Sequence, residues 1–250
     1  MALSWKIYKR LPDALRSSIE YFYQRDKHGG EEYELPARYR NEIEQSDEFQ
    51  NAVNVYFDLY DIDYKSSNTD GLSMESTYNL YSIIRDIKPS VVVETGVANG
   101  VSSLSVLIAL QKNQEGKLIS IDHPVHLDYT ADELSDTEER FIGWRIPKDK
   151  QPGWIIPEEY RERWEFVQGK SVDELPKVVN ENDIDVFIHD SLHTTTNMIF
   201  EFFITYHSME DDGVILSDDT SKSEAFEIFC TEIDVSDCRK FQNDLGYIKK

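Results

Sequence analysis

Short apolar runs alternate with amphipathic stretches from residue 90 onward. Five of these runs are expected to form strands, at residues 90–94, 117–122, 163–169, 184–190 and 213–219. Between them, residues 102–111 and 196–208 have the length and spacing of helices. Strands that are apolar throughout are buried on both faces, as in a parallel sheet. The alternation therefore predicts a doubly wound α/β sheet that is mostly parallel, with residues 245–248 as the last strand of a closing antiparallel hairpin.

The first 75 residues have a different pattern, polar and aromatic with an irregular period. We interpret residues 1–75 as a helical and irregular extension and residues 76–250 as the main domain. A helix is expected at residues 12–26. A second one is expected at residues 73–87, where apolar side chains recur at helical spacing at Tyr78, Tyr81, Ile84 and Ile87.

Residues 123–162 interrupt the alternation between the second and third predicted strands. This segment contains Trp144 and Trp154 and is rich in proline and glycine. A connection of this length in a compact domain is usually a functional loop or a disordered excursion, and the aromatic residues favour the first. We expect a lid over the ligand-binding edge of the sheet.

The chain is strongly acidic, with 48 acidic and 26 basic residues and a formal charge of −22. Such a surface repels nucleic acid and anionic lipid, so neither is an expected partner. No apolar run approaches the roughly 20 residues of a membrane-spanning helix. The acidity would also fit an organism that lives at high salt. Whether the protein forms a homo-oligomer is left open.

Two cysteines, Cys230 and Cys238, stand eight residues apart without a metal-binding motif around them. We interpret them as incidental reduced thiols. The N-terminus is charged and lacks the apolar stretch of a signal peptide. Both observations predict a cytoplasmic protein.

The loop after the first predicted strand carries Gly96 and Gly100. Glycines between a strand and a helix let the backbone turn sharply and let a ligand approach it closely. The dinucleotide fingerprint fails, because Ala98 and Val101 occupy its second and third glycine positions. A nicotinamide-dependent oxidoreductase is therefore disfavoured. The Walker A pattern also fails around residues 169–171, because no glycine stands at the needed position upstream.

The segment Glu94-Thr95-Gly96-Val97-Ala98-Asn99-Gly100 resembles the E/D-x-G-x-x-x-G first motif of class I S-adenosylmethionine-dependent methyltransferases. The resemblance covers roughly residues 75–250. It is closest to the small-molecule O-methyltransferase group that includes macrolide-sugar (macrocin O-methyltransferase-like) and cephalosporin-tailoring enzymes. It implies a Rossmann-like methyltransferase sheet with S-adenosylmethionine as the cofactor.

The resemblance also implies which residues bind this cofactor. Asp122 ends the second strand, where the family keeps the acid that takes the ribose hydroxyls, and a carboxylate can accept from both of them. The stretch that includes Ser171 resembles the family's segment near the adenine, although Lys170 departs from the usual acid. The expected cofactor-binding residues are Glu94, Gly96, Gly100, Ser102, Asp122, His123, Ser171 and Asp190.

The segment "IHDSLHT", residues 188–194, follows directly on the fourth apolar run. In the fold that the resemblance implies, this strand neighbours the fifth one, so Asp190, Asp218 and Asp219 would meet at one edge. Three crowded carboxylates repel one another unless they are protonated or neutralised by a cation. The related sugar O-methyltransferases use such a trio for a divalent metal, so Mg²⁺ is expected here. The alternative is that Asp218 and Asp219 are loop residues, one of them capping the next helix.

Methyl transfer to a hydroxyl also needs a group that removes its proton. His193 is the first candidate for this base and Asp190 the second. His189, on a buried strand, is expected to be a hydrogen-bonded core residue.

Two functional hypotheses follow. The first is a methyltransferase that acts on a hydroxyl of a small polar acceptor, such as a sugar or a glycan precursor, with divalent-metal assistance. The second is a non-catalytic domain that binds S-adenosylmethionine or a nucleoside and acts as a partner or regulator.

Overall fold

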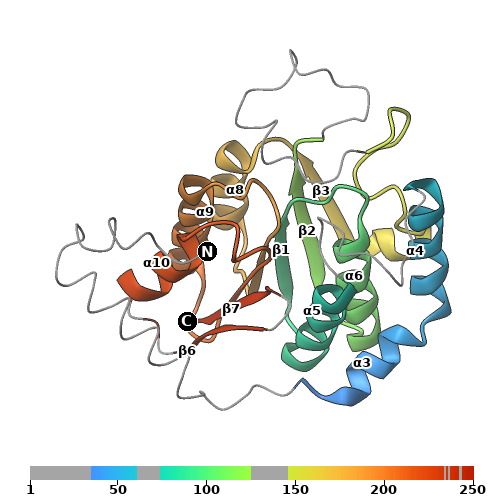
Figure 1. The fold of residues 1–250 in the computed structure, drawn as a ribbon, viewed down its shortest axis with the longest axis horizontal. Coiled ribbons are helices and arrows are strands. Elements are labelled where there is room, and N and C mark those ends of the chain that lie inside the picture. Colours follow the sequence, from blue (N-terminus) through green and yellow to red (C-terminus); the bar gives the residue numbers. More distant parts are fainter. Residues whose placement is uncertain (1–34, 61–73, 125–145, 234, 236, 242–243) are drawn as a thin grey trace.

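A twisted sheet lies at the centre of the computed structural model, which describes residues 35–60, 74–124, 146–233, 235, 237–241 and 244–250 (Figure 1). Within these residues the strand order is β3-β2-β1-β4-β5-β7-β6. The first five strands pair in parallel, and each overlaps the run predicted for it. They are β1 (Val91–Thr95), β2 (Lys117–Asp122), β3 (Trp164–Gln168), β4 (Val186–His189) and β5 (Val214–Ser217).

The sheet is closed by an antiparallel hairpin, β6 (Asp237–Lys240) and β7 (Gly246–Lys249), whose second strand pairs with β5. The last strand begins one residue later than the sequence pattern predicted. The prediction of a doubly wound, mostly parallel sheet with a closing hairpin is confirmed.

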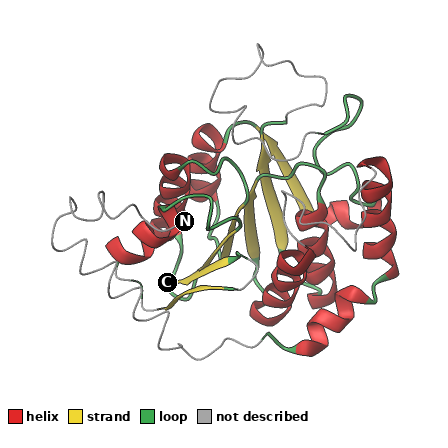
Figure 2. Cartoon of the chain, in the orientation of Figure 1, coloured by secondary structure: helices red, strands yellow, loops and turns green. Residues whose placement is uncertain are grey.

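Helices cover both faces of the sheet and bury two separate apolar cores (Figure 2). Successive strand residues point to opposite faces, so Val92 packs in one core and Val93 in the other. One face lies under α5 (Met74–Ile87) and α6 (Val101–Asn113). The other lies under α8 (Ser171–Glu181), α9 (Thr195–Ser208) and α10 (Ala225–Glu232). The sequence reading missed α8, which contains Pro176 and buries only Leu175 and Val178.

The described part of the N-terminal extension packs against the main domain. Its helices are α3 (Ala37–Glu44) and α4 (Asp47–Tyr60), and both contribute to the core under α5 and α6. Glu42 of α3 accepts hydrogen bonds from the Tyr81 hydroxyl and from Arg85 Nε, both at 2.9 Å. The helix predicted at residues 12–26 lies outside the described residues. Of the helices that are described, none has the length and apolarity to span a membrane.

The end of the predicted lid is built into the core. Ile155 and Ile156 are buried, and a short 3₁₀ helix, η2 (Glu158–Arg163), leads into β3. Gly153 N–H donates to the Ala98 carbonyl at 3.0 Å, so this segment braces the outside of the glycine loop. Residues 125–145, the rest of the predicted lid, lie outside the described residues.

Gly96 lets two strand ends approach each other closely. Its φ is +88°, a left-handed conformation that side chains rarely adopt. A Cβ atom there would lie 2.1 Å from the carbonyl oxygen of Asp190. Glycine is therefore required for the β1 loop to lie against the end of β4.

A buried carboxyl group, that of Glu94, ties β1 to α6 and β2. It accepts hydrogen bonds from the hydroxyls of Ser102 (2.8 Å), Ser103 (2.6 Å) and Ser120 (2.8 Å). Burial raises the pKa of Glu94 to about 7, because three neutral donors compensate only part of the lost hydration. Below that pH the protonated form predominates.

A second buried carboxyl group, that of Glu201 on α9, ties the ends of β1 and β4 together. It accepts from the Thr95 hydroxyl at 2.7 Å and from the Ser191 hydroxyl at 2.8 Å, and it lies 2.7 Å from His189 Nδ1. Burial would raise the pKa of Glu201, but His189 and the other donors lower it to about 2. His189 is thus the hydrogen-bonded core histidine that was predicted.

The expectation of two reduced thiols is wrong. Cys230 at the end of α10 and Cys238 on β6 form a disulfide, with 6.2 Å between their Cα atoms. The eight-residue spacing of the two cysteines carried no signal of this pairing. The prediction of a cytoplasmic location rested partly on reduced cysteines, and the disulfide removes that part of the argument.

Replacing each of the two buried glutamates by glutamine should lower the free energy of unfolding by a different amount. At pH 6, Glu201→Gln should lower the free energy of unfolding by about 3 kcal/mol, because it leaves His189 facing an amide. Glu94→Gln should cost about 1 kcal/mol, because Glu94 is mostly protonated at that pH and hydroxyl partners can reorient. Urea denaturation followed by circular dichroism measures both. Equal losses would contradict the assigned ionisation states.

The two groups also give opposite pH dependences. The pKa of Glu201 is below its ordinary value of 4.5, so its stabilising contribution is present above pH 4.5 and is lost toward pH 2. The pKa of Glu94 is above 4.5, so its contribution weakens as the pH rises through about 7.

The disulfide should stabilise the closing hairpin against α10. The free energy of unfolding of the double variant Cys230→Ser/Cys238→Ser should be about 2 kcal/mol lower than that of the oxidised protein, as expected for a short closed loop. Adding dithiothreitol to the wild type should reproduce that loss and leave the variant unchanged. A wild-type melting curve that is insensitive to the reductant would contradict the bond's contribution.

Candidate active site

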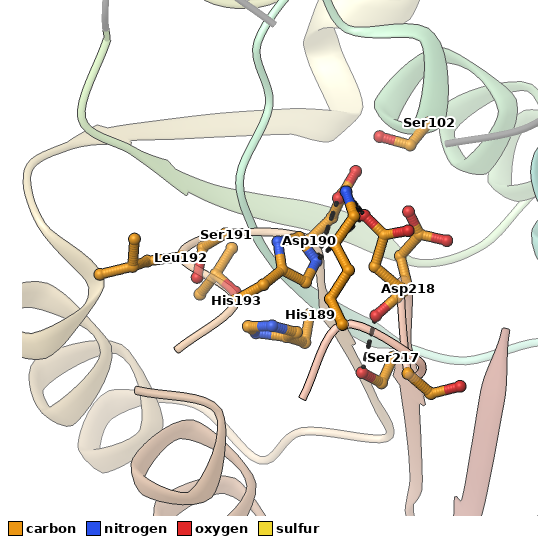
Figure 3. A network of polar contacts seen from close by, with 12 residues as sticks. Ser102, His189, Asp190, Ser191, Leu192, His193, Ser217 and Asp218 are labelled. Carbon is orange, nitrogen blue, oxygen red and sulfur yellow. Dashed lines mark hydrogen bonds and ion pairs between the residues drawn. The ribbon is translucent and has the colours of Figure 1, made fainter. Parts of the chain in front are cut away.

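Three aspartates meet where β4 and β5 end. Asp190 directly follows β4, and Asp218 and Asp219 directly follow β5. The two strands pair in register, and Asp218 N–H donates to the His189 carbonyl at 2.9 Å, so both ends lie at the same edge. We call Asp190, Asp218 and Asp219 the acid cluster. Figure 3 shows Asp190 and Asp218 beside His189, the last residue of β4, and His193, which follows the strand.

The alternative role for the last two aspartates, capping the next helix, is wrong. The residue at the N-cap of α10 is Glu224, which makes no side-chain capping bond. The first N–H of α10, that of Ala225, is bound instead by the Ser223 hydroxyl at 3.0 Å. Asp219 adopts a left-handed backbone conformation, with φ +52°, in the turn after β5.

His193 points into the acid cluster. Its Nε2 atom lies 3.9 Å from Asp190 Oδ1 and 3.8 Å from Asp219 Oδ2, which is beyond hydrogen-bonding distance. The ring is 7% exposed, and Nε2 has no hydrogen-bond partner among the described residues. Burial, together with repulsion from His189 and Lys222, lowers the pKa of His193 to about 3. The imidazole is therefore neutral at physiological pH.

Two carboxyl groups of the cluster, those of Asp190 and Asp218, resist ionisation. Burial and the charges of Asp218 and Asp219 raise the pKa of Asp190 well above its usual range. Burial and Asp219 likewise raise the pKa of Asp218. Asp218 is only 3% exposed, and its Oδ2 atom has no hydrogen-bond partner among the described residues. The cluster thus presents two carboxyl groups with raised pKa values and, among the described residues, an unsatisfied oxygen at the sheet edge.

A lysine lies beside the cluster. Lys222 forms an ion pair with Asp219, three residues earlier in the chain. Its charge also acts on Asp218 and Asp190, and all three carboxylates raise the pKa of Lys222 although burial lowers it. Sequence reasoning missed this residue, whose only signal was its spacing of three from the last acid in "DDTSK".

The cluster as it stands does not have the arrangement of a metal centre. Among the described residues, no group of three or more histidine, cysteine, aspartate or glutamate side chains is placed to hold a metal ion. Lys222 already supplies a positive charge on Asp219.

The predicted cofactor-binding residues line the same edge at the ends of β1, β2 and β3. Asp122 accepts from the backbone N–H groups of Val97 and Ala98, at 3.2 and 2.8 Å, and so holds the glycine loop. His123 is exposed just beyond β2, and Ser171 begins α8 after β3. Gly100 precedes the first residue of α6 in a left-handed conformation.

Two predicted cofactor residues are buried and face inward. Glu94 and Ser102 are bonded to each other beneath the loop, so in this structure they support the loop that carries Gly96. Sequence reasoning also missed Glu201, which fixes the end of β4 from below. A single acid among the aromatic and apolar residues of α9 was the signal that could have revealed it.

Solved structures with a similar fold include several methyltransferases. The O-methyltransferase NovP is 16% identical with a TM-score of 0.54, over 71% of this chain and 80% of its own. The O-methyltransferase TomG from Streptomyces achromogenes, in complex with SAM, is 13% identical with a TM-score of 0.51, over 82% and 91%. Cofactor-bound Rv0187 from MTB is 14% identical with a TM-score of 0.51, over 82% and 90%. At these identities the likeness shows the fold.

The family is shown by a sequence model. No curated protein matches the chain. The model described as a methyltransferase domain matches residues 93–220, which is 128 of the 250 residues and spans the glycine loop, β2 to β5 and the acid cluster. Because that match covers more than half of the chain and includes the whole candidate site, the protein belongs to the methyltransferase domain family and is a class I, Rossmann-like methyltransferase.

Proposed function

We propose that this protein is an S-adenosylmethionine-dependent O-methyltransferase acting on a small polar acceptor such as a sugar or glycan precursor. One observation carries the proposal: the acid cluster lies against the glycine loop, with Gly96 packed on the Asp190 carbonyl. At that junction, Asp218 Oδ2 and His193 Nε2 are buried polar atoms that find no partner in the described part of the chain. Such atoms suit a ligand that brings hydroxyl groups.

The residues at this edge fit the proposed donor. Asp122 at the end of β2 has lone pairs left beside the two backbone bonds that it accepts, and these can take ribose hydroxyls. The acid cluster suits a cationic sulfur by charge. When bound, the donor supplies an electrophilic methyl group. We assign its binding to the residues that the sequence predicted, with Glu94 and Ser102 acting from beneath the loop.

The role of proton acceptor falls to Asp190 ahead of His193. A general base works best when its pKa lies near the working pH. Burial and the neighbouring acids raise the pKa of Asp190 well above the ordinary range of a carboxyl group, which makes it the stronger base, whereas the pKa of His193 is lowered to about 3. In the proposed reaction the acceptor oxygen takes the methyl group, its proton passes to Asp190, and the neutral thioether leaves. Neutral His193 can hydrogen-bond the acceptor from the side.

Mg²⁺ held by the acid cluster stays a prediction from the sequence. The side chains as they lie do not fit it, because Asp219 is paired with Lys222 and the described residues offer no ready group of metal ligands. The proposed reaction therefore contains no step that depends on a metal.

The donor site is tested with S-adenosylhomocysteine. Asp122→Ala should weaken its binding by roughly 1–3 kcal/mol, because ribose contacts are lost and the glycine loop loosens. Isothermal titration calorimetry measures the change. Asp185→Ala is the matched control, since Asp185 accepts from Ser90 and Val91 N–H at the opposite end of β1, at 2.7 and 2.9 Å. Equal affinity in wild type and Asp122→Ala would remove Asp122 from the donor site.

The base is tested by transfer of a labelled methyl group to a panel of sugars and other polyhydroxylated acceptors. Asp190→Asn should slow transfer by roughly 10²–10⁴-fold while S-adenosylhomocysteine still binds. The wild-type rate should fall as the pH drops through the raised pKa of Asp190, because only the ionised carboxylate accepts a proton. A larger loss of transfer in His193→Gln than in Asp190→Asn would assign the base to His193 instead.

A further inference from the structure

We infer that Lys222 is the built-in cation of the acid cluster and takes the place that a divalent metal would otherwise hold. The starting observation is the ion pair of its ammonium group with Asp219. The same charge also acts on Asp218 and Asp190 at longer range, although the ion pair itself is with Asp219. The crowded carboxylates need positive charge, and this one comes from the chain itself.

The turn that carries Lys222 is anchored, so the backbone from which the lysine side chain extends is held in place. Lys222 N–H donates to the Asp219 carbonyl at 2.9 Å, which closes the turn. Asp244, in the connection between β6 and β7, accepts from the Thr220 hydroxyl at 2.6 Å and from Ser221 N–H at 3.1 Å. The closing hairpin therefore fixes the backbone from which the lysine reaches the cluster.

The other groups around the cluster favour a single fixed cation over a metal. His193 Nε2 points toward Asp190 and Asp219 but binds neither, and Asp218 Oδ2 is buried and unpaired. A divalent ion needs several oxygen ligands that converge on it. Here one of the three acids is engaged by lysine, and the described side chains form no converging group.

The inference concerns the same site as the proposed function and deepens it. If methyl transfer takes place here, Lys222 supplies the positive charge beside the acceptor oxygen that a metal would supply in a metal-dependent enzyme. The lysine charge itself can be tested without any acceptor.

The test is Mn²⁺ binding to the full-length protein, followed by electron paramagnetic resonance and calorimetry. The wild type should show no site that depends on the acid cluster. Lys222→Met should gain one, with at least about tenfold tighter Mn²⁺ binding, because a competing positive charge has been removed. Adding Asp219→Asn to Lys222→Met should abolish the gain, and Lys222→Arg should behave like the wild type.

Lys249→Met is the matched control. Lys249 also forms an ion pair with an aspartate, Asp212, at 2.7 Å, and its side chain is 39% exposed against 42% for Lys222. Removing it should leave Mn²⁺ binding unchanged, because Asp212 precedes β5 and lies away from the cluster.

Two results would overturn the inference. One is a wild-type Mn²⁺ site that Asp219→Asn removes. The other is folded Lys222→Met protein with no tighter binding than the wild type. If Lys222→Met does not fold, Lys222→Gln is measured in its place. The Mn²⁺ measurement on the wild type tests the inference independently of either variant. Binding of S-adenosylhomocysteine is measured in parallel. A wild type that does not bind S-adenosylhomocysteine would count against the proposed function. The result on Lys222 would be unaffected.

Discussion

The candidate site depends on the carboxylate of Glu201, buried beneath the ends of two neighbouring strands. A parallel sheet leaves the carboxyl ends of its strands without backbone partners beyond the last ladder bond. Glu201 accepts from Thr95 at the end of β1 and pairs with His189 at the end of β4. It also holds Ser191 in the following segment. Asp190, between His189 and Ser191, is thereby fixed against the glycine loop from below.

Glu94 and Glu201 show how the partners of a buried acid decide its ionisation. Both side chains are fully buried. Glu94 has three hydroxyl partners, which solvate a charge only partly, and its pKa rises to about 7. Glu201 has an imidazole among its partners, and its pKa falls to about 2. A permanently charged Glu201 orients the donors around the site, while Glu94 holds α6 and β2 to β1 without a fixed charge.

Much of the fold could be predicted from the sequence, because buried parallel strands are apolar throughout and their order along the chain repeats. The meeting of Asp190 with Asp218 and Asp219 followed from strand ends once strands four and five were taken as neighbours. The disulfide and Lys222 could not be predicted in this way. Each depends on where a turn directs a side chain, and apolar periodicity carries no information about that. The inward orientation of Glu94 was also hidden, since its contacts depend on serines from two other elements.

The neighbouring groups also decide the ionisation of the carboxyl groups in the acid cluster, as they do for Glu94 and Glu201. Neutral donors would leave its carboxyl groups protonated, as they leave Glu94, and a protonated group cannot take up a proton. Strong hydrogen-bonding partners on every acid would leave them ionised and weakly basic, as the partners of Glu201 leave that carboxyl group. Lys222 is paired with Asp219 only, so the pKa of Asp190 stays raised. One cation for three acids is therefore the balance that keeps a carboxylate basic enough to accept a proton from a hydroxyl.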